Sequence, residues 1–134
     1  MHRANRALMA YANARTTEAL GVSTAQLGTI YYVAKHPHCS LTDIADVLDL
    51  NKSAVSSMVQ RLERAELVRR EANPRDARGS LLTLTERGES VRARSLAVTR
   101  QLTAEITSGF SEEEVTTVAR FLDTILAMCG GGDE

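Results

Sequence analysis

The residues best suited to binding chemistry lie on one side of the stretch 51–67, NKSAVSSMVQRLERAEL. At 100° per residue, the apolar side chains of an α-helix over this stretch fall on one face and the polar ones on the other. The polar face carries hydroxyls, an amide and arginines: Ser53, Ser56, Ser57, Gln60, Arg61 and Arg64. Hydroxyls permit close approach to a surface, and Gln and Arg offer paired hydrogen-bonding groups for base edges and phosphates. This face therefore predicts contact with nucleic acid, with an ordinary polar surface helix as the alternative.

The residues before this stretch predict a second, shorter helix. Residues 40–43, Ser-Leu-Thr-Asp, read as a capping box, in which the first and last side chains each satisfy a free backbone N–H. Apolar residues then recur at helical spacing: Leu41, Ile44, Ala45 and Leu48. A tight connection at 49–50 leads to Asn51, which is suited to cap the next helix. A short helix, a turn and an amphipathic helix form a helix-turn-helix pattern.

Behind the stretch 51–67 the pattern changes to that of a β-hairpin. Residues 67–70 and 82–84 are the strand candidates, and the loop 71–79 between them contains Asn, Pro and Gly, which favour turns. Arg75 and Arg78 lie in this loop. A hairpin with arginines near its tip, directly behind a helix-turn-helix, is predicted to act as a wing. A simple solvated hairpin is the alternative.

Helices with apolar stripes are also predicted at the two ends of the chain. The first covers about residues 2–20 and stops at Gly21. A long helix over about 86–108 follows Thr85 as its cap, and a last helix follows a capping box at 111–114. The winged region is too small to cover these stripes. A second copy of the chain is therefore the expected partner.

The expected fold class is mainly α with a small β-hairpin. We expect a winged helix-turn-helix over residues 23–85 and a helical dimerisation region at 1–22 and 86–134. A length of 134 residues suits one such domain with helical extensions, and the 43% hydrophobic, 4% aromatic composition fits a core of Ala, Leu, Val and Ile.

Charge is distributed unevenly along the chain. The net charge is −1, yet residues 51–100 hold eleven basic and six acidic side chains. Residues 101–134 hold one basic and seven acidic side chains. Because the local potential governs contact with phosphates, the region around the predicted helix-turn-helix can present a basic surface on a nearly neutral protein.

The sequence favours a cytoplasmic protein without a membrane partner. Its apolar runs stay well short of the ~20 residues that span a bilayer, and its N-terminus carries neither a long apolar region nor a cleavage signal. Two cysteines are too few for a disulfide framework.

Several of these motifs occur together in one known family. They are Leu-Thr-Asp-Ile-Ala-Asp-Val-Leu at 41–48, Ser-Ala-Val-Ser at 53–56, Gln-Arg-Leu-Glu at 60–63, Asp-Ala-Arg at 76–78 and Leu-Thr-Leu-Thr-Glu-Arg-Gly at 82–88. With them the chain resembles the MarR family of transcriptional regulators, by motif over about residues 23–90 and elsewhere by the order of its helices. The resemblance implies a homodimeric winged helix-turn-helix repressor without a cofactor.

The resemblance also implies which residues meet double-stranded DNA. The helix over 51–67 would enter the major groove, Arg78 would reach the minor groove, and Asp76 would orient arginine rather than touch DNA. The DNA-binding candidates are Lys52, Ser53, Ser56, Ser57, Gln60, Arg61, Arg64, Arg75 and Arg78. The chain departs from the family pattern at 65–66, where Ala-Glu stands in place of a frequent Gly, and at Ser57, where a larger basic residue is frequent.

A small-molecule effector, often phenolic or aromatic, is a further implication of the resemblance. Its pocket would lie near the first, second and fifth helices. Tyr11, Tyr31 and His36 are the candidate lining residues, although an ordinary core or rim position is the alternative for each.

The alternatives to this function are a metal- or redox-responsive regulator, a protein-binding adaptor and an enzyme. The loop with His36, His38 and Cys39 allows a metal- or redox-responsive regulator, but zinc needs about four ligands and a polar loop with a semi-buried Cys is the simpler interpretation. We expect no metal site. A protein-binding adaptor is another alternative. An enzyme is disfavoured because the chain lacks a Gly-x-Ser-x-Gly elbow, a His-Glu-x-x-His motif and a phosphate-binding glycine loop.

Overall fold

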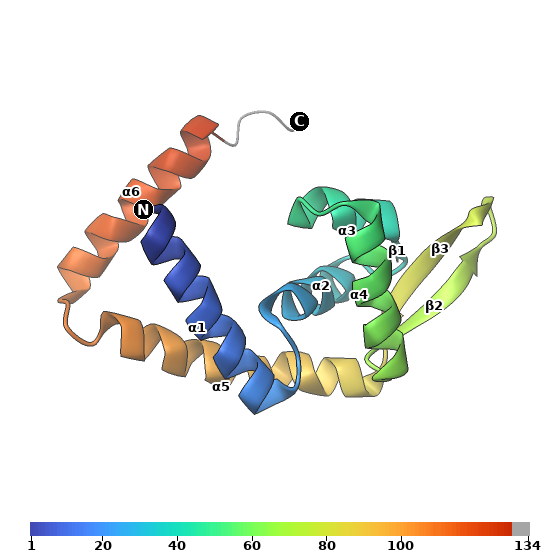
Figure 1. The fold of residues 1–134 in the computed structure, drawn as a ribbon, viewed down its shortest axis with the longest axis horizontal. Helices are drawn as coiled ribbons and strands as arrows, with labels where there is room; N and C mark the ends of the chain where they lie inside the picture. Colours follow the sequence, from blue (N-terminus) through green and yellow to red (C-terminus); the bar gives the residue numbers. More distant parts are fainter. Residues whose placement is uncertain (130–134) are drawn as a thin grey trace. The chain divides into compact units, whose positions relative to one another are not determined.

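The computed structural model describes residues 1–129, apart from the side chain of Ala77, as six helices and three strands (Figure 1). The last five residues of the predicted range 86–134 lie outside the described residues. The chain divides into two compact units, residues 1–99 and the segment from residue 100 onward. Among the described residues, every helix is too short or too polar to cross a membrane.

The first unit begins with α1 (His2–Leu20) and α2 (Thr24–Lys35), and the junction between them follows the predicted signals. Gly21 adopts a φ of 73°, in the left-handed region that glycine enters without steric cost. Ser23 and Gln26 form the predicted capping box, because each side chain accepts a backbone N–H of the other residue.

α3 (Leu41–Leu48) and α4 (Lys52–Arg64) form the predicted helix-turn-helix. Ser40 opens α3 as the first residue of a second capping box. Asp49 turns the chain with a φ of 50°, a left-handed conformation that Asp tolerates better than most residues. Asn51 then caps α4, and its Oδ1 accepts a first-turn backbone N–H at 2.8 Å. These local signals are confirmed.

β1 (Cys39–Ser40), β2 (Val68–Asn73) and β3 (Asp76–Leu84) form an antiparallel sheet in the order β1-β3-β2. The loop predicted over 71–79 is largely strand, and only residues 74–75 form the turn. The prediction was wrong because this part of the hairpin is polar on both faces. Without alternation of apolar and polar residues, sequence gives no strand signal.

The strand β1 was also absent from the sequence prediction, which left Cys39 in a loop. Cys39 pairs with Leu82 of β3, and the N–H of His38 donates to the Leu82 carbonyl at 2.8 Å. A strand of two residues is too short for any periodicity, and its partner lies more than forty positions away in the sequence. The pairing attaches the connection between α2 and α3 to the base of the hairpin.

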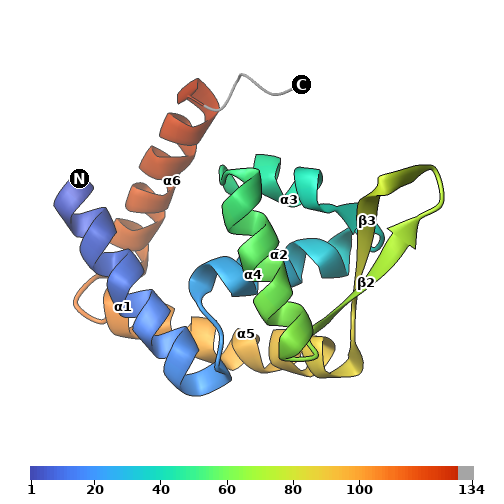
Figure 2. The same cartoon turned by 45° about the vertical axis from the view of Figure 1, so that its right-hand side comes forward.

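Apolar side chains from the helices and strands of the first unit meet in one core. Those without solvent exposure include Ile30, Val33, Ile44, Val55, Val59, Leu62 and Leu82. Figure 2 shows α4 lying across this unit, with the hairpin of β2 and β3 extending to one side of it. The core therefore supports α4 from its apolar face and leaves the opposite face free.

α5 (Glu86–Thr107) starts at a tight joint with the end of α4. Thr85 caps α5 as predicted: its Oγ1 accepts the N–H of Gly88 at 3.0 Å and donates to the Glu66 carbonyl at 2.6 Å. A Cβ built on Gly88 would lie 2.1 Å from the carbonyl oxygen of Leu67, so glycine is what permits this approach. Glu66 adopts a left-handed φ of 59°, at the position where the resemblance leads one to expect glycine.

In the unit from residue 100 onward, the end of α5 is followed by α6 (Glu112–Cys129). Ser111 and Glu114 form the predicted capping box at its start. α6 has no buried residue in the described chain, although its sequence carries a clear apolar stripe. Several large apolar side chains are exposed here: Phe110, Val118, Phe121, Leu122 and Leu126.

The architecture matches the predicted fold class. It is a mainly α protein with a small antiparallel sheet, in which a helix-turn-helix is followed by a hairpin and long helices stand at both ends of the sequence.

We expect Gly88→Ala to lower the free energy of unfolding by about 1–3 kcal/mol, because the added methyl group must displace the Leu67 carbonyl. Gly28→Ala is a matched control within α2, where the new Cβ would meet only Leu48 Cδ2 at 3.5 Å. That change should be neutral or stabilise by about 0.5–1 kcal/mol, as alanine does in a helix interior. Denaturant titration of both variants measures the difference. Equal stabilities for Gly88→Ala and the parent would show that the joint is not tightly packed.

Candidate nucleic-acid interface

The outer face of α4 is exposed along its whole length. Val55, Val59 and Leu62 anchor the opposite face in the core with no solvent exposure, and Met58 is also buried. The seven predicted contact residues on α4 all lie in the exposed class: Lys52, Ser53, Ser56, Ser57, Gln60, Arg61 and Arg64. The helix therefore offers one continuous polar surface with no acidic side chain among these seven positions.

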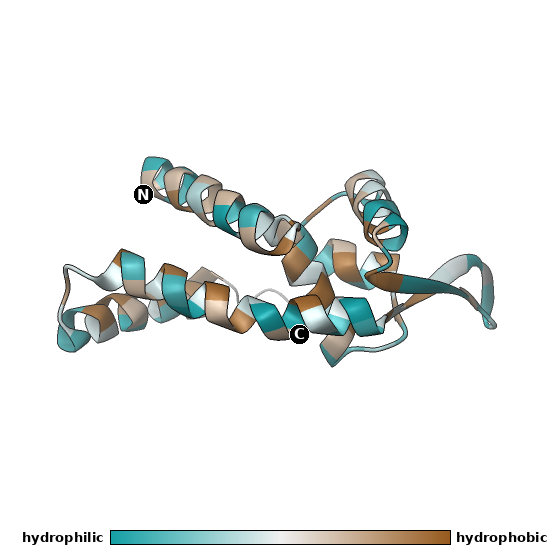
Figure 3. Cartoon of the chain, turned by 90° about the horizontal axis from the view of Figure 1, so that it is seen from below, coloured by the Kyte–Doolittle hydropathy of each residue, from teal (hydrophilic) through white to brown (hydrophobic). Residues whose placement is uncertain are grey.

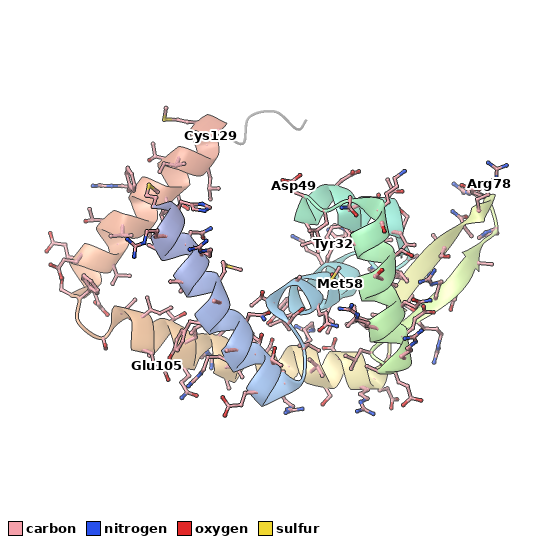
Figure 4. All side chains as sticks on the ribbon, in the orientation of Figure 1. Tyr32, Asp49, Met58, Arg78, Glu105 and Cys129 are labelled. Atoms are coloured by element: carbon pink, nitrogen blue, oxygen red, sulfur yellow. The ribbon has the colours of Figure 1, made fainter. Side chains whose placement is uncertain are left out.

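The hairpin brings the predicted wing residues to its far end, where the labelled Arg78 points away from the strands (Figure 4). Oδ1 of Asp76 accepts the backbone N–H of Arg78 at 3.0 Å. Asp76 thus fixes the backbone of Arg78 and leaves the guanidinium exposed. Oδ1 of Asn73 makes the same contact with the N–H of Arg75, at 2.9 Å. Sequence reasoning singled out Asp76 and missed Asn73.

An ion pair joins α4 to the hairpin. Arg70 Nη2 of β2 lies 3.0 Å from Glu63 Oε2 of α4, and the two side chains are 29% and 32% exposed. Partial burial limits solvent screening, and Arg70 Nε is buried without a hydrogen-bond partner in the described residues. The pair constrains the angle between the two elements that carry the candidate contacts. Sequence reasoning did not connect these residues, because nothing in their spacing shows that a helix side chain meets the next strand.

A groove of about 610 Å³ lies beside α2 and the start of α5. Its lining residues are Gly28, Tyr31, Tyr32, Ala34, Lys35, Val47, Glu89 and Arg92. Arg92 Nε lies 2.9 Å from Glu89 Oε2, and this hydrogen bond lowers the pKa of the Glu89 carboxyl. Tyr31 is the one member of the predicted effector trio in this lining. Its hydroxyl lies 2.6 Å from Oγ of the fully buried Ser95.

Tyr31 is the donor in this hydrogen bond. Ser95 Oγ uses its single proton toward the Arg92 carbonyl, 2.6 Å away, so it accepts from Tyr31. Tyr11 and His36, the other two predicted effector residues, lie outside the lining of this groove. The Arg15 guanidinium lies 6.0 Å from the ring centre of Tyr11, and the ring of His36 lies 4.6 Å from that of Tyr32.

The loop considered for metal or redox chemistry separates its three candidate residues. His36 and His38 are exposed, whereas Cys39 is 6% exposed within β1. Burial, and secondarily the nearby Asp43 carboxylate, raises the pKa of the Cys39 thiol to about 11. Residues 1–129 contain no group of three His, Cys, Asp or Glu side chains arranged to hold a metal ion. Because the pKa of the Cys39 thiol is raised, little reactive thiolate is present at neutral pH.

A helix-turn-helix with an exposed hydroxyl, amide and arginine face, beside a hairpin that ends in arginines, defines a winged helix-turn-helix protein. The sequence profile of the MarR family matches residues 20–79. The HTH-type transcriptional repressor MdtR of Bacillus subtilis (strain 168) is 32% identical over 117 residues, which cover 87% of this chain and 75% of that protein. The chain belongs to the MarR family of transcriptional regulators.

Solved structures share the fold over almost the whole chain. A crystal structure of MarR has a TM-score of 0.88 at 18% identity and covers 95% of both chains. A mutant MarR from E. coli complexed with operator DNA has a TM-score of 0.80 at 24% identity, covering 93% of this chain and 92% of that one. At 18% and 24% identity, these similarities show a shared fold and nothing beyond it.

We expect the Cys39 thiol to resist alkylation in the folded protein, because it is buried and its pKa is raised to about 11. The exposed Cys129 is the internal comparison. Mass spectrometry after brief iodoacetamide treatment at pH 8 should find label on Cys129 first, and on Cys39 only after denaturant is added. Rapid labelling of Cys39 in the native protein would reopen the redox interpretation.

Proposed function

We propose that this chain is a homodimeric repressor that binds a pseudo-palindromic operator and releases it when a small-molecule effector binds. The exposed face of α4, with its hydroxyls, amide and arginines, is the observation that carries the proposal. Membership of the MarR family and the repressor name of the MdtR relative support it. We propose the cytoplasm as the location, since a regulator of this kind acts where the DNA is.

In the proposed complex α4 lies in the major groove. Ser53, Ser56 and Ser57 are short enough to let the helix backbone approach the bases, and Gln60 can both donate to and accept from one base edge. Arg61 and Arg64 carry their charge at the end of α4 that leads toward the hairpin, where they are suited to phosphates.

The hairpin supplies the second proposed contact. Arg78 is exposed at a tip whose backbone Asp76 holds, so its side chain is free to enter a narrow minor groove. A·T-rich sequence favours this contact, because its narrow minor groove concentrates negative potential. Lys52 and Arg75 would add sequence-independent charge contacts.

The proposed dimer accounts for the apolar surface at the ends of the chain. On α1 the side chains of Leu8, Met9 and Tyr11 are more than 40% exposed, and Figure 3 shows hydrophobic segments recurring along this helix. In the unit from residue 100 onward, an apolar groove of about 310 Å³ includes Val118 and Leu122. Exposed apolar stripes of this length need a partner, and a second copy supplies matching ones. Residues 1–22 and 86–134 are the proposed dimerisation region.

The groove beside α2 is the proposed effector site. It offers two tyrosine rings, and the cation of Lys35 is available to an acidic ligand. Tyr31 links this groove to α5 through Ser95, so a ligand that moves Tyr31 also acts on a helix of the proposed dimerisation region. The metal- or redox-responsive alternative has less support, because the Cys39 thiol is buried.

Substitutions in α4 and in the hairpin should weaken DNA binding in different ways. We expect Gln60→Ala to cost about 1–3 kcal/mol on the preferred operator and little on random DNA, because it removes a base contact. Arg78→Ala should weaken binding to operator and random DNA alike. It should also lower the salt slope, the steepness with which log affinity falls with log salt concentration, by about one unit per lost ionic contact in each subunit. Arg100→Ala is the control, since it removes the same charge outside the winged helix-turn-helix.

The measurement is fluorescence anisotropy on operator and random duplexes over a salt series, with the operator selected from random DNA by the purified protein. Two half-sites about one helical turn apart are expected in it. A parent protein with no salt-dependent DNA binding would overturn the proposal. If the parent binds and Arg78→Ala keeps the same affinity and slope, the wing assignment is wrong.

The dimer assignment has its own test. Leu122→Glu places a charge in the apolar groove of α6 and should reduce the dimer fraction at micromolar concentration. Thr124→Glu adds the same charge to an exposed position outside this groove and should leave the dimer intact. Analytical ultracentrifugation measures both. A folded monomer of the unmodified chain at micromolar concentration would contradict the proposal.

A further inference from the structure

The tip of the hairpin contains the same three-residue arrangement twice in succession. Asn73-Pro74-Arg75 is followed at once by Asp76-Ala77-Arg78. In each, the side-chain oxygen of the first residue accepts the backbone N–H of the arginine two positions later, at 2.9 Å and 3.0 Å. Side-chain to backbone contacts of this type stabilise local turns.

The strand register shows where the two arginines stand. Asn73 pairs with Asp76, so Arg75 lies in the two-residue turn between the strands. The preceding residue of β2, Ala72, pairs with Ser80, and residues 77–79 of β3 therefore form a bulge. Arg75 and Arg78 thus occupy the two irregular positions of the hairpin, where regular strand pairing does not hold the backbone.

The side chain of Asn73 lies between the turn and the bulge of the hairpin. A Cβ built on Gly79 would lie 3.4 Å from Asn73 Nδ2, so the Asn73 side chain lies close to the backbone of the bulge. Asn73 is half-buried, whereas Pro74, Arg75 and Asp76 are exposed. Its side chain therefore accepts a hydrogen bond from the turn and lies beside the bulge.

A backbone that is already fixed at the two arginines favours DNA binding, because a mobile backbone would have to be ordered when the complex forms. Immobilising a mobile residue at an interface costs free energy, and prior order removes part of that cost. Asp76 supplies this order for Arg78, and Asn73 supplies it for Arg75 through the same contact.

We infer that Asn73 is a positioning residue that holds Arg75 as a second charged DNA contact, so that each wing presents two fixed arginines. This inference rests on the proposed DNA binding by the hairpin. Arg75 is the group that meets DNA, and Asn73 acts through it.

A double-mutant cycle tests the inference on the full chain, with a mixed-sequence duplex and an A·T-rich duplex as probes. Arg75→Ala should lower the salt slope by about two units per dimer on both duplexes. Asn73→Ala should weaken binding by about threefold to tenfold, because Arg75 must then be ordered on binding. In the Arg75→Ala background, Asn73→Ala should have no further effect. In the Arg78→Ala background its full effect should remain.

Asn73→Ser is the conservative variant, because its hydroxyl oxygen can accept the Arg75 N–H and it adds no charge beside the DNA. It should restore most of the affinity that Asn73→Ala loses. Thermal unfolding by circular dichroism should give similar midpoints for all variants, since these residues lie far from the core along the hairpin.

Three outcomes would overturn the inference. In one, Asn73→Ala weakens binding equally with and without Arg75, which indicates a general role in hairpin shape. In another, Asn73→Ser binds no better than Asn73→Ala. In the third, Arg78→Ala lowers affinity and slope while Arg75→Ala changes neither, in which case the proposed DNA binding stands and only the second contact is lost. If the parent shows no salt-dependent binding, the proposed function itself fails.

Discussion

The approach of Gly88 to the Leu67 carbonyl is the contact on which the geometry of the first unit depends. α4 ends, β2 begins and α5 starts within this small volume, and Thr85 ties them together through its contacts with Glu66 and Gly88. A side chain at position 88 would force these elements apart. Because all three meet at one close-packed joint, α5 has little room to move without displacing α4 or the hairpin.

Support from the core on one face and solvent on the other suit α4 to the DNA contact proposed for it. Its apolar residues lie in the core, and the ion pair of Glu63 with Arg70 joins it to the hairpin. The backbone of α4 then needs little reorganisation when it enters the proposed DNA complex. Prior ordering is also present in the groove beside α2. There Tyr31 donates to Ser95, whose hydroxyl is already held by a hydrogen bond within α5.

Sequence predicted the features that depend on near neighbours. The capping residues Ser23, Ser40, Asn51 and Ser111, the buried and exposed faces of α4, and the start of α5 all follow from contacts within a few positions. Sequence failed where the cause lies far along the chain. The strand at Cys39, the length of the hairpin and the partners of Arg70 and Tyr31 arise from tertiary packing, which periodicity does not record. The departure at 65–66 was visible in sequence, but only the structure gives Glu66 its left-handed backbone.

The order β1-β3-β2 leaves β2 at the border of the sheet, with a row of backbone groups that no strand of the first unit pairs. Such a border can recruit a strand from another molecule and so begin aggregation. Arg69, Arg70 and Glu71 place three charges in succession along it. Because charged side chains disfavour the addition of a strand from another molecule, the charges that help to hold α4 against the hairpin also guard the sheet border against aggregation.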